Sequence, residues 1–119
     1  MFTLSSSNRF HLYSEPTDMR KSFNGLSGLV ENELDRTPLS GEVFLFINKR
    51  RDKIKLLHWG AGGYTLYYKR LESGTFELPD YEVSESSIAI NYTQMVMIVD
   101  GLSIKNIHRR KRYESTKAS

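Results

Sequence analysis

Two runs of cationic side chains are the residues of this sequence whose types and spacing could do chemistry. The first is KRRDK at residues 49–53, which places four cations around one acid. The second is HRRKRY at residues 108–113. Lysines and arginines at this density are the groups with which proteins neutralise the phosphates of nucleic acids. The plain alternative in both places is a solvated surface, because exposed charge by itself stabilises little.

Two shorter basic pairs extend these runs. Arg20 and Lys21 stand early in an expected helix, where they either meet a phosphate or form the helix's polar face. Lys69 and Arg70 follow two tyrosines at the end of an expected strand. The residues that we expect to contact a polyanion are therefore Arg20, Lys21, Lys49, Arg50, Arg51, Lys53, Lys69, Arg70, Arg109, Arg110, Lys111 and Arg112.

Catalysis and metal binding find little support in the sequence. Cysteine is absent, and the three histidines lack the spacing of metal ligands. The glycine-rich stretch GAGG at residues 60–63 lacks the lysine-serine ending of a phosphate-binding loop, so we expect a hairpin turn there. We therefore expect no catalytic residue, no metal site and no cofactor.

The distribution of charge along the chain is more informative than its total, which is only +3. Residues 49–70 hold seven basic residues against one acid, whereas residues 72–100 hold six acids and neither lysine nor arginine. The acidic stretch either forms a solvated face or balances the basic one within the fold. No apolar run approaches membrane-spanning length and the first residues are polar, so we expect a cytoplasmic protein without membrane contact.

A helix and several strands must position these side chains. Apolar residues recur at steps of three and four between residues 19 and 34, which predicts a long helix capped at Thr17 or Asp18. A second, brief helix is expected to begin at a Thr93 cap and to end at Gly101. Strands are expected at residues 9–13, 43–48, 53–59 and 64–70, with short additions at 75–78 and 88–90.

The expected fold class is α+β. A small antiparallel sheet, a meander of three to five strands, would be packed by one long N-terminal helix and one short C-terminal helix. A length of 119 residues suits one domain. We place this domain at residues 1–107 and expect residues 108–119 to form a basic, flexible tail.

The turns decide which side chains share a face of the sheet. If residues 49–52 form a four-residue turn, Val43 lies opposite His58. If Trp59 likewise lies opposite Tyr64, then Trp59, Tyr64 and Tyr68 share one face, and Tyr67 lies on the other. A slip of one residue in either turn would exchange these memberships, because side chains alternate between the faces of a strand.

In either register both faces carry large apolar groups, and the brief second helix can cover only part of one face. We therefore expect Trp59, Tyr64 and Tyr68 to form an aromatic platform that binds a partner protein. The basic residues that would rim this platform are Lys53, Lys55 and Arg70. The plain alternative is that the aromatic rings belong to the core and only their polar groups reach water.

Three segments of the sequence contain distinctive motifs. They are EPTDMRKSFNGL at residues 15–26, then PLSG at 38–41 with VFLFINKRRDKIKLL at 43–57, and then YYKRL at 67–71 with FELP at 76–79. In combination they closely resemble the TnpB-type accessory protein encoded by the second open reading frame of insertion-sequence family 66, a family of bacterial transposable elements. The resemblance spans roughly residues 9–79, and the last third of the chain matches more loosely.

The resemblance implies a small helper of transposition that is encoded beside a separate transposase and has no catalytic residues of its own. The cations that fall within the matching motifs are Arg20, Lys21, Lys49, Arg50, Arg51, Lys69 and Arg70. We therefore expect a non-enzymatic, nucleoid-associated protein that binds element ends or target DNA through its hairpin and tail within a transposase complex. The alternative is an adaptor that docks the transposase or another accessory protein through the aromatic face, without touching DNA.

Overall fold

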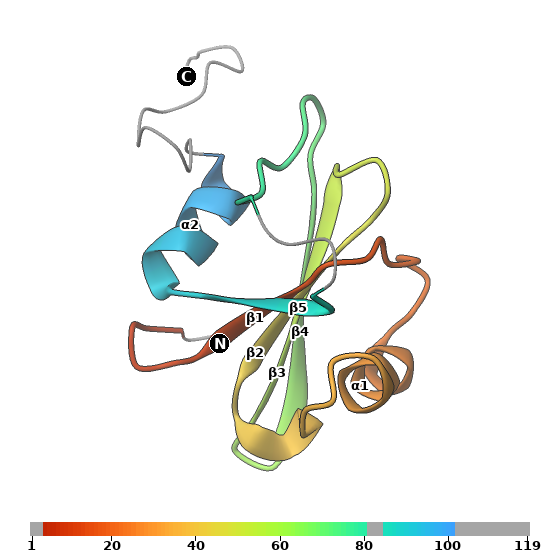
Figure 1. The fold of residues 1–119 in the computed structure, drawn as a ribbon, viewed down its shortest axis with the longest axis vertical. Coiled ribbons are helices and arrows are strands. Elements are labelled where there is room, and N and C mark those ends of the chain that lie inside the picture. Colours follow the sequence, from red (N-terminus) through yellow and green to blue (C-terminus); the bar gives the residue numbers. More distant parts are fainter. Residues whose placement is uncertain (1–3, 81–84, 102–119) are drawn as a thin grey trace.

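The structure, a computed structural model, describes residues 4–80 and 85–101. Within them the chain forms a five-stranded sheet with helices on both of its faces (Figure 1). In chain order the elements are β1 (Phe10–Tyr13), α1 (Phe23–Asn32), the 3-10 helix η1 (Pro38–Ser40), β2 (Val43–Ile47), β3 (Lys53–Gly60), β4 (Gly63–Arg70), β5 (Ser87–Ile90) and α2 (Tyr92–Asp100).

The sheet is mixed, which corrects the expected antiparallel meander. Its strand order is β4-β3-β2-β1-β5. The β1 strand pairs in parallel with β2, and each of the other neighbouring pairs is antiparallel. The segment between β1 and β2 contains α1 and η1, and a crossover of that length is what lets two consecutive strands run in parallel. The β2–β3–β4 part is a meander, and β1 and β5 extend it on the far side.

The first helix is shorter than expected, which is a second correction to the fold class. It spans ten residues and begins at Phe23, not near Asp18. The cause lies in β3, where the Lys55 ammonium donates hydrogen bonds of 2.7 Å to the backbone carbonyls of Met19 and Lys21. In a helix that began at residue 18, these carbonyls would accept from amides four residues later instead. The segment before α1 is thus held to the sheet in a non-helical form.

The two helices cover opposite faces of the sheet, as Figure 1 shows for α1 and α2. The core on the α1 side consists of Leu26, Val30, Leu34, Phe44, Phe46 and Leu57. The core on the α2 side consists of Phe10, Leu12, Val43, Leu45, Ile47, Ile54, Leu56, Phe76, Ile90, Met95, Ile98 and Val99. Successive residues of β2 enter different cores because side chains alternate along a strand. Both apolar faces are therefore covered at their centres.

The expected register of both hairpins is confirmed. Val43 pairs with His58 across β2 and β3, and Trp59 pairs with Tyr64 across β3 and β4. The strand expected at residues 75–78 is wrong, because that segment forms no strand. Its backbone is bonded elsewhere, and the N–H group of Phe76 donates to the Arg51 carbonyl at 2.7 Å.

The second helix ends as expected but begins with a different cap. Gly101 closes α2 in the left-handed conformation, with a φ of 85°. At the other end the cap is Asn91 instead of Thr93. The Asn91 side chain accepts a 2.7 Å hydrogen bond from the Gln94 N–H group, while Gln94 Oε1 accepts one of 2.9 Å from the Asn91 N–H group. This reciprocal pair is a capping box, which satisfies two amides that a helix start leaves without partners.

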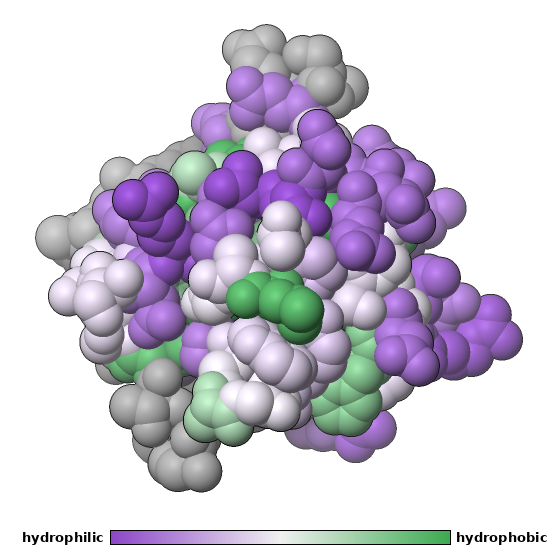
Figure 2. Space-filling model, turned by 90° about the horizontal axis from the view of Figure 1, so that it is seen from below, coloured by the Kyte–Doolittle hydropathy of each residue, from purple (hydrophilic) through white to green (hydrophobic). Residues whose placement is uncertain are grey.

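The end of the molecule that carries η1 and the β3–β4 turn has a mostly hydrophilic or neutral surface with small, separate hydrophobic spots (Figure 2). Over the described ranges, the large hydrophobic side chains that are exposed are Phe23, Leu39 and Tyr68. Of the helices in these ranges, none has the length and hydropathy needed to cross a membrane.

Candidate nucleic-acid interface

The turn between β2 and β3 is organised by one side chain, Asn48. Its Oδ1 accepts hydrogen bonds from the backbone N–H groups of Asp52 at 3.1 Å and Lys53 at 2.9 Å. Its Nδ2 donates to Asp52 Oδ1 at 2.7 Å, and this bond, with the charge of Lys53 nearby, lowers the pKa of Asp52. Arg51 completes the turn with a φ of 59°. The hairpin tip is therefore held in a defined conformation by local hydrogen bonds.

The tip presents three cations to solvent. Lys49, Arg50 and Arg51 are exposed, and none of them takes part in an ion pair with another described residue. The fourth cation, Lys53, is half-buried, and its Nζ lies 3.6 Å from Asp52 Oδ1. Within the acidic stretch at residues 72–100, Glu72 pairs with Arg70 and not with the hairpin tip.

An open groove of about 470 Å³ lies beside the tip and gathers cations from three parts of the chain. The segment before α1 supplies Arg20, the turn supplies Lys49 and Arg50, and the first residue of β3 supplies Lys53. The wall also contains Tyr68 of β4, and we call this feature the basic groove. The charged, apolar and aromatic residues that line it are Asp18, Met19, Arg20, Lys49, Arg50, Lys53 and Tyr68. The lining of the groove therefore contains four cationic side chains and a single carboxylate, that of Asp18.

Asp18 orients Arg20 within the groove. The Arg20 Nη2 group donates to Asp18 Oδ2 at 2.7 Å, and Arg20 Nε lies 3.1 Å from both carboxylate oxygens. These hydrogen bonds lower the pKa of Asp18 to about 2 and raise the pKa of Arg20. The Arg20 side chain is 91% exposed, so the pair positions the guanidinium more than it stabilises the fold.

Lys55 lies under the groove and not on the rim of an aromatic platform, so that expectation is wrong. Its side chain is buried, with 6% of the residue exposed. Besides the two carbonyls that it binds, its ammonium lies 4.6 Å from the centre of the Tyr68 ring. Lys55 therefore joins three groove-building pieces, which are the segment before α1, β3 and β4.

Four of the described basic residues named from the sequence do not line the groove, and they are Lys21, Arg51, Lys69 and Arg70. Lys21 is exposed beside it. Lys69 points to the opposite face of the sheet, where its Nζ donates to the Val99 carbonyl at the end of α2 at 2.7 Å. Arg70 forms an exposed ion pair of 3.1 Å with Glu72. The four tail cations Arg109, Arg110, Lys111 and Arg112 lie outside the described residues.

The three aromatic residues of the expected platform do not form one surface. Trp59 and Tyr64 contact each other edge to face at 5.0 Å, at the end of the sheet farthest from the β2–β3 turn. Phe23 of α1, 42% exposed, stacks on Tyr64 at 6.4 Å. Tyr68 is 50% exposed and belongs to the basic groove at the other end. The aromatic face is thus divided into a hydrophobic cluster and a single groove residue.

Two groove residues, Asp18 and Met19, were not indicated by the density of charge. The available signal was their place beside Arg20 in the EPTDMRK motif, but a helix was expected there and would have turned these side chains in different directions. Tyr68 was indicated as a partner-binding residue, and only the strand pairing between Lys55 and Tyr68 places it against the cations.

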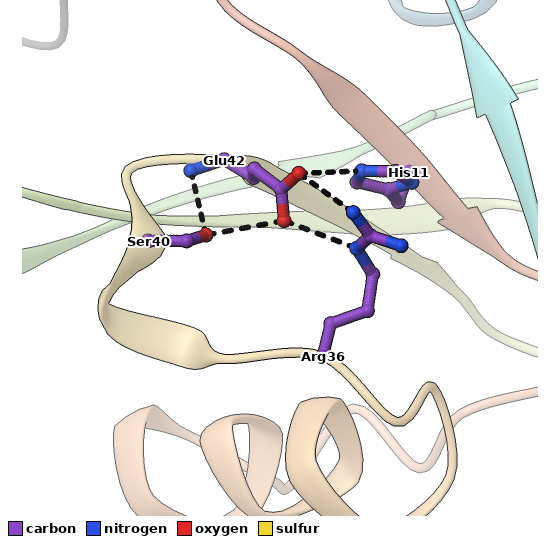
Figure 3. Close-up of polar contacts among 4 residues, drawn as sticks. All are labelled: His11, Arg36, Ser40 and Glu42. Atoms are coloured by element: carbon purple, nitrogen blue, oxygen red, sulfur yellow. Dashed lines mark hydrogen bonds and ion pairs between the residues drawn. The ribbon is translucent and has the colours of Figure 1, made fainter.

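A second polar cluster lies at the start of β2 and has no counterpart in the sequence analysis (Figure 3). Glu42 accepts hydrogen bonds from Arg36 at 2.8 and 3.0 Å and from the Ser40 hydroxyl at 3.1 Å, and it bonds to His11 Nε2 at 3.1 Å. The contact with Arg36 is the main cause that lowers the pKa of Glu42 to about 2. His11 is buried and stacks on Phe44 at 5.7 Å. The cluster ties the η1 loop to β1.

Comparison with known proteins places the chain in a family. The model of the family described as IS66 Orf2 like protein matches residues 8–109. This protein belongs to the IS66 Orf2-like family. The groove residues Asp18 to Tyr68 all lie within the part that the family model matches. Membership of this family fits an accessory protein of transposition, in agreement with the resemblance of the motifs.

Two relatives in Sinorhizobium fredii (strain NBRC 101917 / NGR234) are similar to the chain over most of its length. The first, "Uncharacterized protein y4jC", is 31% identical over 111 residues, which cover 93% of each chain. The second, "Uncharacterized protein y4hO", is 31% identical over 101 residues, which cover 85% of this chain and 84% of the relative. No solved structure matches the chain. Both relatives thus align with this chain over most of their own length.

Proposed function

We propose that this protein is a non-catalytic accessory protein of DNA transposition that binds DNA directly, with the β2–β3 turn as the principal contact. The expected cations of the tail, Arg109 to Arg112, and the exposed Lys21 would add further phosphate contacts. The DNA would be an element end or the target, held within a transposase complex in a nucleoid-associated pool of the protein.

The observation that carries this proposal is the basic groove beside a tip of exposed cations. Arg50 and Lys49 are exposed, lie in a turn that Asn48 holds in place, and face Arg20 from a distant part of the chain. Because the backbone of the turn is already held in place, binding to phosphates would order only the side chains of these two cations. The contacts available are to the DNA backbone, so sequence selection would come from DNA shape or from partner proteins.

The test is a salt series of binding to a duplex that carries an element end. The full chain should bind with an affinity that falls steeply as salt rises, and replacing Lys49, Arg50 and Arg51 by alanine should make the salt dependence shallower by about 0.9 in slope per lost contact. The matched control is Arg9→Ala. Arg9 is an exposed arginine at the opposite end of the sheet, where its carbonyl accepts from the Val43 N–H group. An unchanged slope in the hairpin variant would contradict the proposal.

The hydrophobic cluster of Phe23, Trp59 and Tyr64 supports a second candidate, an adaptor that docks the transposase without touching DNA. Phe23 is exposed and sits against Tyr64, so the cluster offers stacked rings to a partner. Trp59→Ala should then abolish transposase pull-down while Arg50→Ala leaves it intact. Loss of pull-down in Arg50→Ala alone would speak against the adaptor, provided that both variants melt like the wild-type protein.

A further inference from the structure

The basic groove contains an aromatic ring whose position phosphate binding does not explain. Tyr68 is the only aromatic residue lining the groove among the described residues, and half of it is exposed. Phosphates need cations and N–H donors, and a tyrosine ring gives them nothing but its hydroxyl. A half-exposed ring among cations is instead suited to stack on a flat, uncharged group that is covalently attached to phosphates.

A buried ammonium group lies over the Tyr68 ring. The Lys55 ammonium lies over the ring at 4.6 Å from its centre, and this ammonium is itself fixed by the carbonyls of Met19 and Lys21. One face of the ring thus lies under a buried cation, and the residue is still half exposed where it lines the groove. Met19, which also lines the groove, offers an apolar, adaptable neighbour for a second flat group.

We propose that the basic groove binds single-stranded DNA, with one unpaired base stacked on Tyr68 and the flanking phosphates held by Arg20, Lys49, Arg50 and Lys53. The inference rests on the proposed function, of which it names the substrate. A positively charged groove with an aromatic stacking residue is the arrangement by which proteins bind single strands without reading their sequence. Bases inside a duplex are stacked on their neighbours, so a duplex offers this ring no free base face.

The experiment compares two probes of the same sequence, a single strand and its duplex, by fluorescence anisotropy with the full chain. The single strand should bind more tightly. Tyr68→Leu, which keeps an apolar side chain and removes the ring, should weaken binding of the single strand about tenfold and leave duplex binding unchanged, since stacking contributes about 1–3 kcal/mol per base and 1.4 kcal/mol is tenfold. Tyr68→Phe should retain the wild-type affinity.

A probe change tests the stacking without altering the protein. A strand of the same length with abasic sites keeps its phosphates, and it should bind the wild-type chain about tenfold more weakly than the intact strand, with the same salt slope. This measurement stands even if Tyr68→Leu does not fold. Equal affinity for abasic and intact strands would overturn the inference.

The charged wall of the groove has a matched pair of variants in the same turn. Arg50 lines the basic groove, whereas Arg51 lines a neighbouring pocket with Tyr13 and Leu78. Arg50→Ala should lower the single-strand salt slope by about 0.7, and Arg51→Ala, with the same loss of charge, should leave it nearly unchanged. Equal effects of the two variants would show that net charge alone, and not the groove, holds the strand.

The outcomes separate this inference from the proposed function. Duplex and single strand bound equally well, with Tyr68→Leu without effect, would overturn the single-strand assignment and leave direct DNA binding standing. No binding of either probe would overturn both. An RNA strand of the same sequence that binds more tightly than the DNA strand would overturn the assignment to DNA.

Discussion

At the scale of single residues, two charged side chains lie largely out of contact with water. Each of them forms several hydrogen bonds within the protein. Lys55 donates to two carbonyls and lies over a ring, and Glu42 accepts from Arg36 and Ser40 and bonds to His11. A buried charge without such partners would destabilise the fold by several kcal/mol. Both contacts link segments that are far apart in sequence, so they act as tethers as well as charges.

Glu42 should make stability depend on pH in acid. Its pKa is lowered from 4.5 to about 2 in the folded protein, chiefly by the hydrogen bonds from Arg36. A lowered pKa means that the carboxylate's contribution is complete above the unfolded value and is lost as the pH falls toward the folded one. Glu42→Gln should therefore reduce the free energy of unfolding by about 1–3 kcal/mol at neutral pH, and urea titrations should show this difference shrinking below about pH 4.

The control for this prediction is Glu72→Gln. Glu72 pairs with Arg70 on the surface, where its side chain is 81% exposed, and such pairs contribute about 0–1 kcal/mol. A Glu42→Gln variant as stable as Glu72→Gln at neutral pH would show that the cluster in Figure 3 does not support the fold.

At the scale of elements, the ends of helices and strands are set by polar side chains that precede them. Asn48 shapes the β2–β3 turn and Asn91 begins α2, each through hydrogen bonds to backbone amides a few residues ahead. Before α1 no such cap forms, because the Ser22 side chain makes no capping bond, and the start of that helix is decided by the contact of Lys55 with the preceding segment. Local caps and long-range contacts therefore share the task of delimiting elements.

The capping of α2 can be tested by two alanine variants two residues apart. Asn91→Ala should lower the free energy of unfolding by about 1 kcal/mol, because it removes the side-chain oxygen that accepts from the Gln94 N–H group. Thr93→Ala should change it by less than about 0.5 kcal/mol, since Thr93 is exposed within the first turn of the helix. Thermal or urea denaturation monitored by circular dichroism measures both. A larger loss from Thr93→Ala than from Asn91→Ala would restore Thr93 as the cap.

At the scale of the whole molecule, the sheet separates two cores. Each is closed by one helix, so the sheet is buried at its centre while its outer strands β4 and β5 have neighbours on one side only. The cations that we assign to DNA gather on one end and on the α1 side of this layer structure, beside the β2–β3 turn. The arrangement lets a binding surface be altered at the tip without disturbing either core.

Because the two cores are separate, substitutions in different cores should have additive effects on the free energy of unfolding. Leu26→Ala should lower the free energy of unfolding by about 2–5 kcal/mol and Ile98→Val by about 0.5–1.5 kcal/mol. Because the sheet lies between them, the double variant should show the sum within about 0.5 kcal/mol in urea titrations. The pair Leu26→Ala with Val30→Ala, within one core, should depart from additivity. Strong coupling of Leu26 with Ile98 would instead indicate a single cooperative core.

Much of this protein follows from its sequence alone. Alternating apolar residues and the turns at residues 49–52 and 60–63 determined the β2–β3–β4 meander and its register, because strand period and turn length are local properties. The exposed cations of the hairpin tip followed in the same way, since a turn cannot bury them. The motifs likewise led to the family that residues 8–109 match.

Only the tertiary structure decided how these pieces are joined. The parallel pairing of β1 with β2, the late start of α1 and the burial of Lys55 all depend on contacts between segments at least 30 residues apart, such as those of Lys55 with Met19 and Lys21. The same contacts bring Tyr68 and Arg20 into one groove. A local pattern specifies which face of a strand is apolar, but the partner that covers that face is chosen by the packing of the whole chain.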